Sequence, residues 1–164
     1  MDGCILDNPE PEDGKKIWKY KTGTDYPHKG WWGRPESLDL TVFDIQPIEC
    51  IHNIIKNDCE DAITILLTNR MIKLEKEVKR ALDKHFIKFD YISLKSDNKN
   101  KAQRIENFIK QLEKSDNKIT EVDFYDDMLC HLEDCNYLPS IFPNVIFNLY
   151  LVKYNDVILY DTNK

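Results

Sequence analysis

The sequence has few of the features that mark secreted or membrane proteins. Its five cysteines are odd in number and form no Cys-x-x-Cys pair, so a disulfide framework is not expected. No apolar run approaches the roughly 20 residues of a membrane span, and no charged-then-apolar leader with a small-residue cleavage site is visible. We therefore expect a cytoplasmic protein with reduced thiols and no membrane partner.

The length and composition favour one folded domain. The chain has 164 residues, of which 41% are hydrophobic and 11% aromatic, and this argues against global disorder. No internal repeat or low-complexity tract divides it. We predict a single domain over residues 1–164, with an insertion or cap-like segment at 9–40, a core at 41–138 and C-terminal edge strands at 139–164.

Charge is unevenly distributed along the chain. The net charge is −6, yet the stretch from Gly14 to Arg34 holds six cations and one anion. Five aromatic residues interleave with these cations: Trp18, Tyr20, Tyr26, Trp31 and Trp32. Such a mixture can bind phosphates and stack bases, with Lys29, Trp31, Trp32 and Arg34 as candidate contacts. Equally, the tryptophans of an insertion can pack on the main domain while its lysines face solvent. The prolines and glycines of this segment predict irregular backbone, as in a lid.

Beyond residue 40 the sequence alternates between helical and extended patterns, which indicates a parallel sheet covered by helices. Helices are expected at about 47–57, 70–86 and 101–114, with a short one around residues 128–132. Strands are expected at 62–67, 88–94 and 119–125, followed by an edge hairpin of 145–152 and 157–160. Polar residues follow these strands: Thr68 the first, and Asp126 with Asp127 the third. Open parallel sheets bind ligands at the carboxyl ends of their strands.

Four short motifs then carry a family resemblance. They are Met1-Asp2-Gly3-Cys4-Ile5-Leu6, Leu66-Leu67-Thr68-Asn69-Arg70, Tyr125-Asp126-Asp127-Met128-Leu129-Cys130-His131 and His28-Lys29-Gly30-Trp31-Trp32. In their order and spacing the chain resembles phosphatases of the haloacid dehalogenase (HAD) superfamily over roughly residues 1–138. It is most similar to the branch related to the phosphatase half of polynucleotide kinase-phosphatases and to Swiss army knife RNA repair-like proteins.

The resemblance implies a fold and a chemistry. The fold is a Rossmann-like three-layer α/β sandwich with a mostly parallel sheet, whose first strand is missing or truncated here. Mg²⁺ is held by Asp126, Asp127 and the backbone carbonyl of Asp2, whose carboxyl exchanges a proton with the leaving group.

Further residues contact the phosphate or the rest of the substrate. Thr68 binds a phosphate oxygen from a helix start, and either Lys95 or Lys101 neutralises phosphoryl charge. Asn69, Arg70 and His131 are expected to contact the substrate. Each also has a structural interpretation: helix caps for Thr68 and the aspartate pair, surface positions for the lysines, and a satisfied core position for His131.

The first motif departs from the family, because the nucleophilic aspartate would precede Met1. We therefore expect the 164-residue chain to have no phosphatase activity. Two explanations for the absent nucleophile stay open: a longer native chain that contains it, or a short form that has lost catalysis and retains phosphate or partner binding. Three functions stay open: a phosphatase acting on a phosphomonoester, with a nucleic-acid end or nucleotide as candidate substrate; a phosphate or nucleic-acid binder without activity; and a protein-interaction domain. No Gly-x-x-x-x-Gly-Lys-(Ser/Thr) loop is present, so no kinase half is predicted. The oligomeric state stays undetermined.

Overall fold

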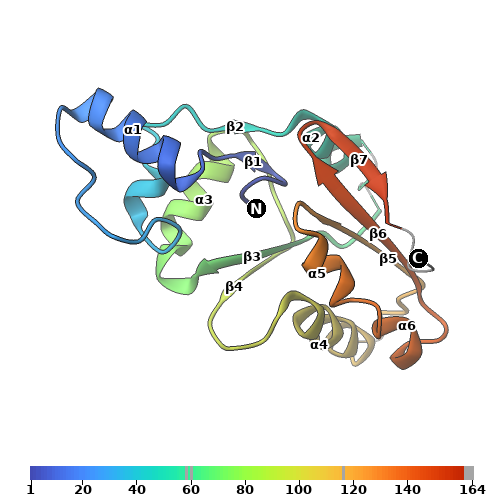
Figure 1. The fold of residues 1–164 in the computed structure, drawn as a ribbon. Coiled ribbons are helices and arrows are strands. Elements are labelled where there is room, and N and C mark those ends of the chain that lie inside the picture. The colour runs from blue at the N-terminus through green and yellow to red at the C-terminus, as the bar shows by residue number, and fades with distance from the viewer. Residues whose placement is uncertain (58, 60, 116, 161–164) are drawn as a thin grey trace. The chain divides into compact units, whose positions relative to one another are not determined.

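The computed structural model describes residues 1–57, 59, 61–115 and 117–160. The chain divides into two compact units, Met1–Ser96 and Asp97–Lys164, and we describe each by itself. The single domain expected from the sequence stays a prediction. Figure 1 shows their helices and strands. Within the described residues, no helix is long and apolar enough to cross a membrane. All five cysteines are described, and none forms a disulfide.

Unit 1 begins with a tight turn at Gly3, where φ is 70°. Strand β1 (Leu6–Asp7) follows and pairs antiparallel with β2 (Gln46–Pro47). Between them lie helix α1 (Pro11–Thr22) and a 3-10 helix, η1 (Pro35–Leu38). The irregular backbone that we predicted for this segment is wrong over α1. Pro11 sits in the first turn, where it costs no hydrogen bond, and Gly23 ends the helix at φ 73°, so both residues act as helix boundaries.

The rest of unit 1 builds a parallel strand pair. Helix α2 (Glu49–Asn57) precedes β3 (Ile65–Met71), which pairs parallel with β4 (Tyr91–Lys95). A 3-10 turn, η2 (Ile72–Leu74), and helix α3 (Glu75–Asp83) connect the two strands. Strand β3 starts later than predicted and also ends later. It ends later because Thr68 and Arg70 continue the alternation of inward positions that Leu66 begins. Both polar side chains are buried, which the apolar pattern could not indicate.

Unit 2 contains a three-stranded sheet. Strand β5 (Glu121–Asp126) pairs parallel with β6 (Ile146–Lys153), which pairs antiparallel with β7 (Asp156–Leu159), so the predicted edge hairpin is confirmed. Helix α4 (Lys101–Glu113) precedes the sheet, and α5 (Leu129–Glu133) and α6 (Leu138–Ile141) connect β5 to β6. Asn100 and Gln103 form a capping box that fixes the start of α4.

The fold class is mixed α/β, with parallel pairing in two of the three small sheets of the described residues. Among the described residues, β3 has β4 as its only strand neighbour, and β5 has β6 as its only strand neighbour. The other edge of β3 and the other edge of β5 therefore have no strand partner. The resemblance places a further strand before Asp2. The Rossmann-like three-layer sandwich therefore stays a prediction.

Candidate functional site

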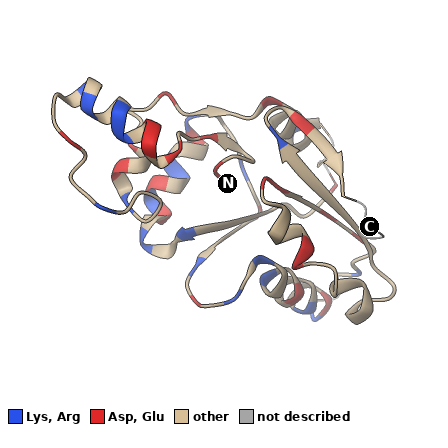
Figure 2. Ribbon diagram, in the orientation of Figure 1, with Lys and Arg blue, Asp and Glu red and all other residues tan. Residues whose placement is uncertain are grey.

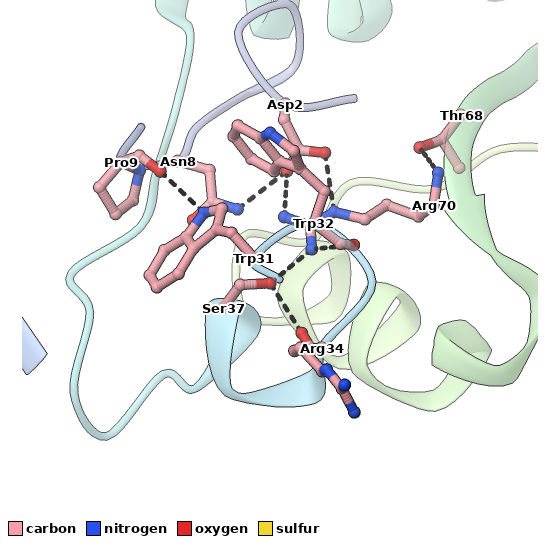
Figure 3. Close-up of polar contacts among 9 residues, drawn as sticks. All are labelled: Asp2, Asn8, Pro9, Trp31, Trp32, Arg34, Ser37, Thr68 and Arg70. Atoms are coloured by element: carbon pink, nitrogen blue, oxygen red, sulfur yellow. Dashed lines mark hydrogen bonds and ion pairs between the residues drawn. The ribbon is translucent and has the colours of Figure 1, made fainter. Parts of the chain in front are cut away.

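The candidate site of unit 1 is a buried ion pair between Asp2 and Arg70, shown in Figure 3. Arg70 Nε donates to Asp2 Oδ2 at 2.9 Å and Nη2 donates to Asp2 Oδ1 at 3.0 Å, which is the two-pronged geometry of a strong arginine–carboxylate pair. Asn8 Nδ2 also donates to Oδ1, at 2.9 Å. Both oxygens of Asp2 therefore accept hydrogen bonds within unit 1.

The same guanidinium holds the segment that contains Trp32. Arg70 Nη1 donates to the Trp32 carbonyl at 2.8 Å and to the Ser37 hydroxyl, which itself donates to the Arg34 carbonyl at 2.7 Å. Arg70 Cζ lies 4.9 Å from the centroid of the Trp32 ring, within the range of a cation–π contact. Arg70 thus fastens residues 32–37 to β3. This use of its donors differs from the substrate contact that we expected.

The charge state of Asp2 follows from these contacts. Burial would raise the pKa of Asp2, but the hydrogen bonds and the positive charge of Arg70 outweigh it, and the pKa lies below the ordinary 3.8. At neutral pH this carboxylate is ionised, and its two hydrogen-bonded oxygens anchor the first turn. The proton exchange expected of Asp2 stays a prediction.

The two adjacent tryptophans occupy different positions. Trp31 is 4% exposed, and its Nε1 donates to the Pro9 carbonyl at 3.2 Å. Its ring lies so close to Gly14 of α1 that an added Cβ would stand 2.2 Å from two ring atoms. Trp31 is therefore a core residue, and the base-stacking role expected for it does not fit. Trp32 is 37% exposed.

An aromatic cluster, in which Trp31 and Phe43 are buried and Trp18 and Tyr26 are half-buried, contains three of the five aromatic residues expected to stack bases. Trp18, Tyr26, Trp31 and Phe43 pack ring against ring, with centroids 5.1–6.5 Å apart. This matches the interpretation in which the tryptophans of the insertion pack inward. Figure 2 marks the basic positions along α1 in blue. Of these, Lys16, Lys19 and Lys21 are exposed and Lys15 is half-buried. Lys29, Arg34 and Tyr20 are exposed as well. Two of the α1 lysines pair locally: Lys16 with Asp13 and Lys19 with Asp25.

Thr68 does not begin a helix, as the resemblance implied, but lies inside β3. Its hydroxyl oxygen accepts from the Arg70 backbone N–H at 3.1 Å. Thr68 lies in a strand and not at a helix start because Arg70, two residues later, is buried and the chain stays extended up to it. The adjacent Asn69 is exposed.

The candidate site of unit 2 is centred on Asp126, the last residue of β5. Its carboxylate is buried and forms an ion pair with Lys101 of α4 through Oδ2. Its other oxygen, Oδ1, lies 2.9 Å from His131 Nδ1 and accepts from the Met128 N–H at 3.0 Å. Burial would raise the pKa of Asp126, but the charge and hydrogen bond of Lys101, together with the hydrogen bonds of His131 and the Met128 backbone, hold it below 3.8.

Asp127 differs in electrostatic state from its neighbour. Burial and the negative charge of Asp126 both raise the pKa of Asp127 above 3.8. A divalent cation would relieve this repulsion, and adjacent carboxylates supply the hard oxygen ligands that Mg²⁺ prefers. Both Asp126 oxygens are already engaged, Oδ2 by Lys101 and Oδ1 by His131 and Met128, so the Mg²⁺ site stays a prediction. In the described part of the chain, no group of three or more histidine, cysteine, aspartate or glutamate side chains could enclose a metal alone.

The structure separates the two candidate lysines. Lys101 is buried against Asp126, and their pairing joins α4 to the end of β5. Lys95 ends β4 in unit 1 and is half-buried. The structure places Lys101, the first residue of α4, at the unit 2 carboxylate.

Sequence reasoning missed several residues that complete these networks. Asn8 donates a hydrogen bond to Asp2, and the Ser37 hydroxyl accepts one from Arg70, 33 positions later in the sequence. No spacing rule predicts either contact. Cys135 Sγ donates to the His131 carbonyl at 3.3 Å. Burial, with the charges of Asp134 and Asp126, raises the pKa of this thiol to about 12, so it stays protonated.

Comparison of the chain with family models, with curated proteins and with solved structures found no match. The HAD resemblance therefore depends on the four sequence motifs alone and stays a prediction.

Proposed function

We propose that this chain is a phosphate-handling domain of the HAD type, built as a Mg²⁺-dependent phosphomonoester phosphatase. The observation that carries the proposal is the end of β5, where an ionised, buried Asp126 is followed by Asp127 with a raised pKa. Titratable groups shifted in opposite directions at adjacent positions are more typical of ligand sites than of plain helix caps.

Four residues around the end of β5 in unit 2 have a role in this proposal. Asp126 and Asp127 would hold Mg²⁺, which offsets the repulsion between carboxylates and an anionic phosphoryl group. The Lys101 ammonium would neutralise charge on the phosphoryl oxygens. His131, held by Asp126 through Nδ1, would contact the substrate. The exposed lysines and Tyr20 of α1 favour a nucleic-acid end or a nucleotide as the phosphomonoester.

The first test is metal binding by the 164-residue chain. Calorimetric titration with Mg²⁺ should give saturable binding that is lost in Asp126→Asn and in Asp127→Asn. The variant Glu133→Gln, which changes an exposed carboxylate of α5, is the matched control and should bind like the unchanged chain. Absence of Mg²⁺ binding, or binding that neither aspartate variant alters, would contradict the proposal.

The second test is turnover. We expect no Mg²⁺-dependent hydrolysis of p-nitrophenyl phosphate by the 164-residue chain. A longer version, in which an apolar strand ending in aspartate precedes Met1, should release phosphate. Asp127→Asn in that longer version should abolish the release.

A second candidate function, phosphate or nucleic-acid binding without hydrolysis, is favoured by the state of Asp2. Its two oxygens are engaged and its pKa is held low, so it suits anchoring better than proton transfer. This function predicts that a 5′-phosphorylated single strand binds with an affinity that falls steeply with salt and in Lys29→Ala. Binding together with inactivity of the longer version would favour it over hydrolysis.

A further inference from the structure

The carboxylate of Asp126 is held by three donors of unit 2. Its Oδ2 pairs with the ammonium of Lys101, while Oδ1 accepts from the Met128 N–H at 3.0 Å and lies 2.9 Å from His131 Nδ1. The side chains of Asp126 and Lys101 are only 2% and 6% exposed, so their pairing is largely removed from water. A metal ion that binds through this carboxylate must therefore displace at least one of the three donors.

Lys101 is the donor that can leave Asp126 most easily. The Met128 N–H belongs to the backbone directly after β5, and the His131 ring extends from α5 by a short side chain. Lys101 instead reaches the carboxylate with the end of a flexible four-carbon stem. Its positive charge would also repel a divalent cation at the same buried oxygen, a repulsion that the uncharged Met128 N–H lacks.

A displaced Lys101 requires a new negative partner, because a buried ammonium without one is strongly destabilising. A phosphoryl group beside the metal carries the required charge, and lysine is a common phosphate ligand. Metal alone would leave Lys101 unpaired, and phosphate alone would meet the negative charge of Asp126. Each of the two ligands therefore improves the site for the other.

We propose that Lys101 and Mg²⁺ compete for Asp126, and that this competition couples metal binding to phosphate binding. Mg²⁺ takes the place of the ammonium at Asp126 Oδ2, and the freed ammonium pairs with a phosphoryl oxygen. The inference rests on the proposed function, from which it takes the metal and the phosphate, and it adds that one lysine makes their binding cooperative. Such coupling is reciprocal, so each ligand should raise the affinity for the other by the same factor.

Calorimetric titration with Mg²⁺, without and with inorganic phosphate, measures the coupling. Without phosphate, Lys101→Met should bind Mg²⁺ more tightly than the unchanged chain, on the order of 10-fold, because the competing ammonium is gone. Phosphate should strengthen Mg²⁺ binding by the unchanged chain on the order of 10-fold, and by Lys101→Met much less. Lys110→Met is the matched control and should behave like the unchanged chain, because Lys110 lies on the same helix with a 50% exposed side chain paired with Glu106.

Acetylation of lysines by acetic anhydride, read by mass spectrometry, follows the ammonium in the unchanged chain and so does not depend on the stability of a variant. Lys101 should be protected without added metal, become reactive at saturating Mg²⁺, and be protected again when inorganic phosphate is added. Lys110 should react equally in all three conditions.

The outcomes separate this inference from the proposed function. If Mg²⁺ binds but Lys101 stays protected, or if the unchanged chain and Lys101→Met bind Mg²⁺ equally, the competition is overturned and the proposed function stands. If neither chain binds Mg²⁺, both are overturned.

Discussion

Each unit buries an aspartate against a basic side chain, but the two pairs are completed differently. Around Asp2 and Arg70, every bond that we describe joins one part of unit 1 to another, from the first turn to β3 and η1. Asp126 is followed in sequence by a second carboxylate, Asp127, and the pKa of Asp127 is raised. The first pair fastens the fold. The second pair also joins elements of its own unit, α4 to β5, but it lies next to Asp127, whose ionisation is disfavoured, and this neighbour makes the end of β5 the candidate ligand site.

The largest effect is expected from breaking the unit 1 pair. Arg70→Met leaves the Asp2 carboxylate partly buried without its main partner and should lower the free energy of unfolding by about 3–5 kcal/mol. All three tryptophans belong to unit 1, so urea unfolding followed by tryptophan fluorescence reports this unit. Arg80→Met, at an exposed position of α3, is the control. Equal, small losses in both variants would show that the pair is not a structural fastening.

The corresponding change in unit 2 should cost less. Lys101→Met removes the ammonium from Asp126, which keeps its contacts with His131 and Met128, and we expect a loss of about 2–3 kcal/mol. Amide hydrogen exchange of β5 and β6 measures it, because unit 2 contains no tryptophan. Lys110→Met, on the exposed side of the same helix, should change little.

The same variant should alter the acid dependence of stability. In the unchanged chain the folded pKa of Asp126 lies below 3.8, so its contribution is complete above that value and is lost as the pH falls below it toward the folded pKa. Without Lys101, burial raises the folded pKa of Asp126, and the stabilisation should disappear at higher pH. An unchanged acid profile of β5 protection would mean that Lys101 does not set the charge state of Asp126.

A smaller effect tests the packing of α1 in unit 1. Gly14→Ala would place a Cβ 2.2 Å from two ring atoms of Trp31, and the required shift should cost about 1–3 kcal/mol. Gly30→Ala is the matched control, because no atom lies within 4 Å of its added Cβ. Tryptophan fluorescence during urea unfolding measures both. Equal stabilities would show that α1 is not packed against Trp31 as described.

Most elements from residue 47 onward could be predicted from sequence, because apolar spacing determines which face of a helix or strand is inward. The helix predicted at 101–114 and the hairpin at 145–160 show this. The failures occur where polar residues occupy inward positions. Arg70 and Thr68 extend β3 because partners distant in sequence satisfy them, and a local pattern contains no such information. The sequence predicts irregular backbone where α1 forms, because proline and glycine are typical of loops. In α1, however, Pro11 and Gly23 mark the two ends of the helix.

The candidate site shows the same division. The sequence predicted that Asp126 and Asp127 follow a strand; in the structure Asp126 is the last residue of β5 and Asp127 follows it. Which lysine meets Asp126 depends on how α4 packs against β5, so that choice required coordinates. That Trp31 is buried while Trp32 is partly exposed likewise follows from the close approach to Gly14, which no sequence rule predicts.

The smallest expected effect has the opposite sign and defines the comparison most sharply. The folded pKa of Asp127 is raised above 3.8, so its ionisation destabilises unit 2 as the pH rises through that folded value. At neutral pH, Asp127→Asn removes the repulsion with Asp126 and should stabilise unit 2 by about 0.5–1 kcal/mol. Amide exchange of β5 measures the gain, and Glu133→Gln should give none. In unit 1, Asp2→Asn should instead destabilise, because that carboxylate is already paired with Arg70. A gain in stability combined with loss of Mg²⁺ binding would identify Asp127 as a residue retained for a ligand, whereas a loss of stability would place it with Asp2 among the structural carboxylates.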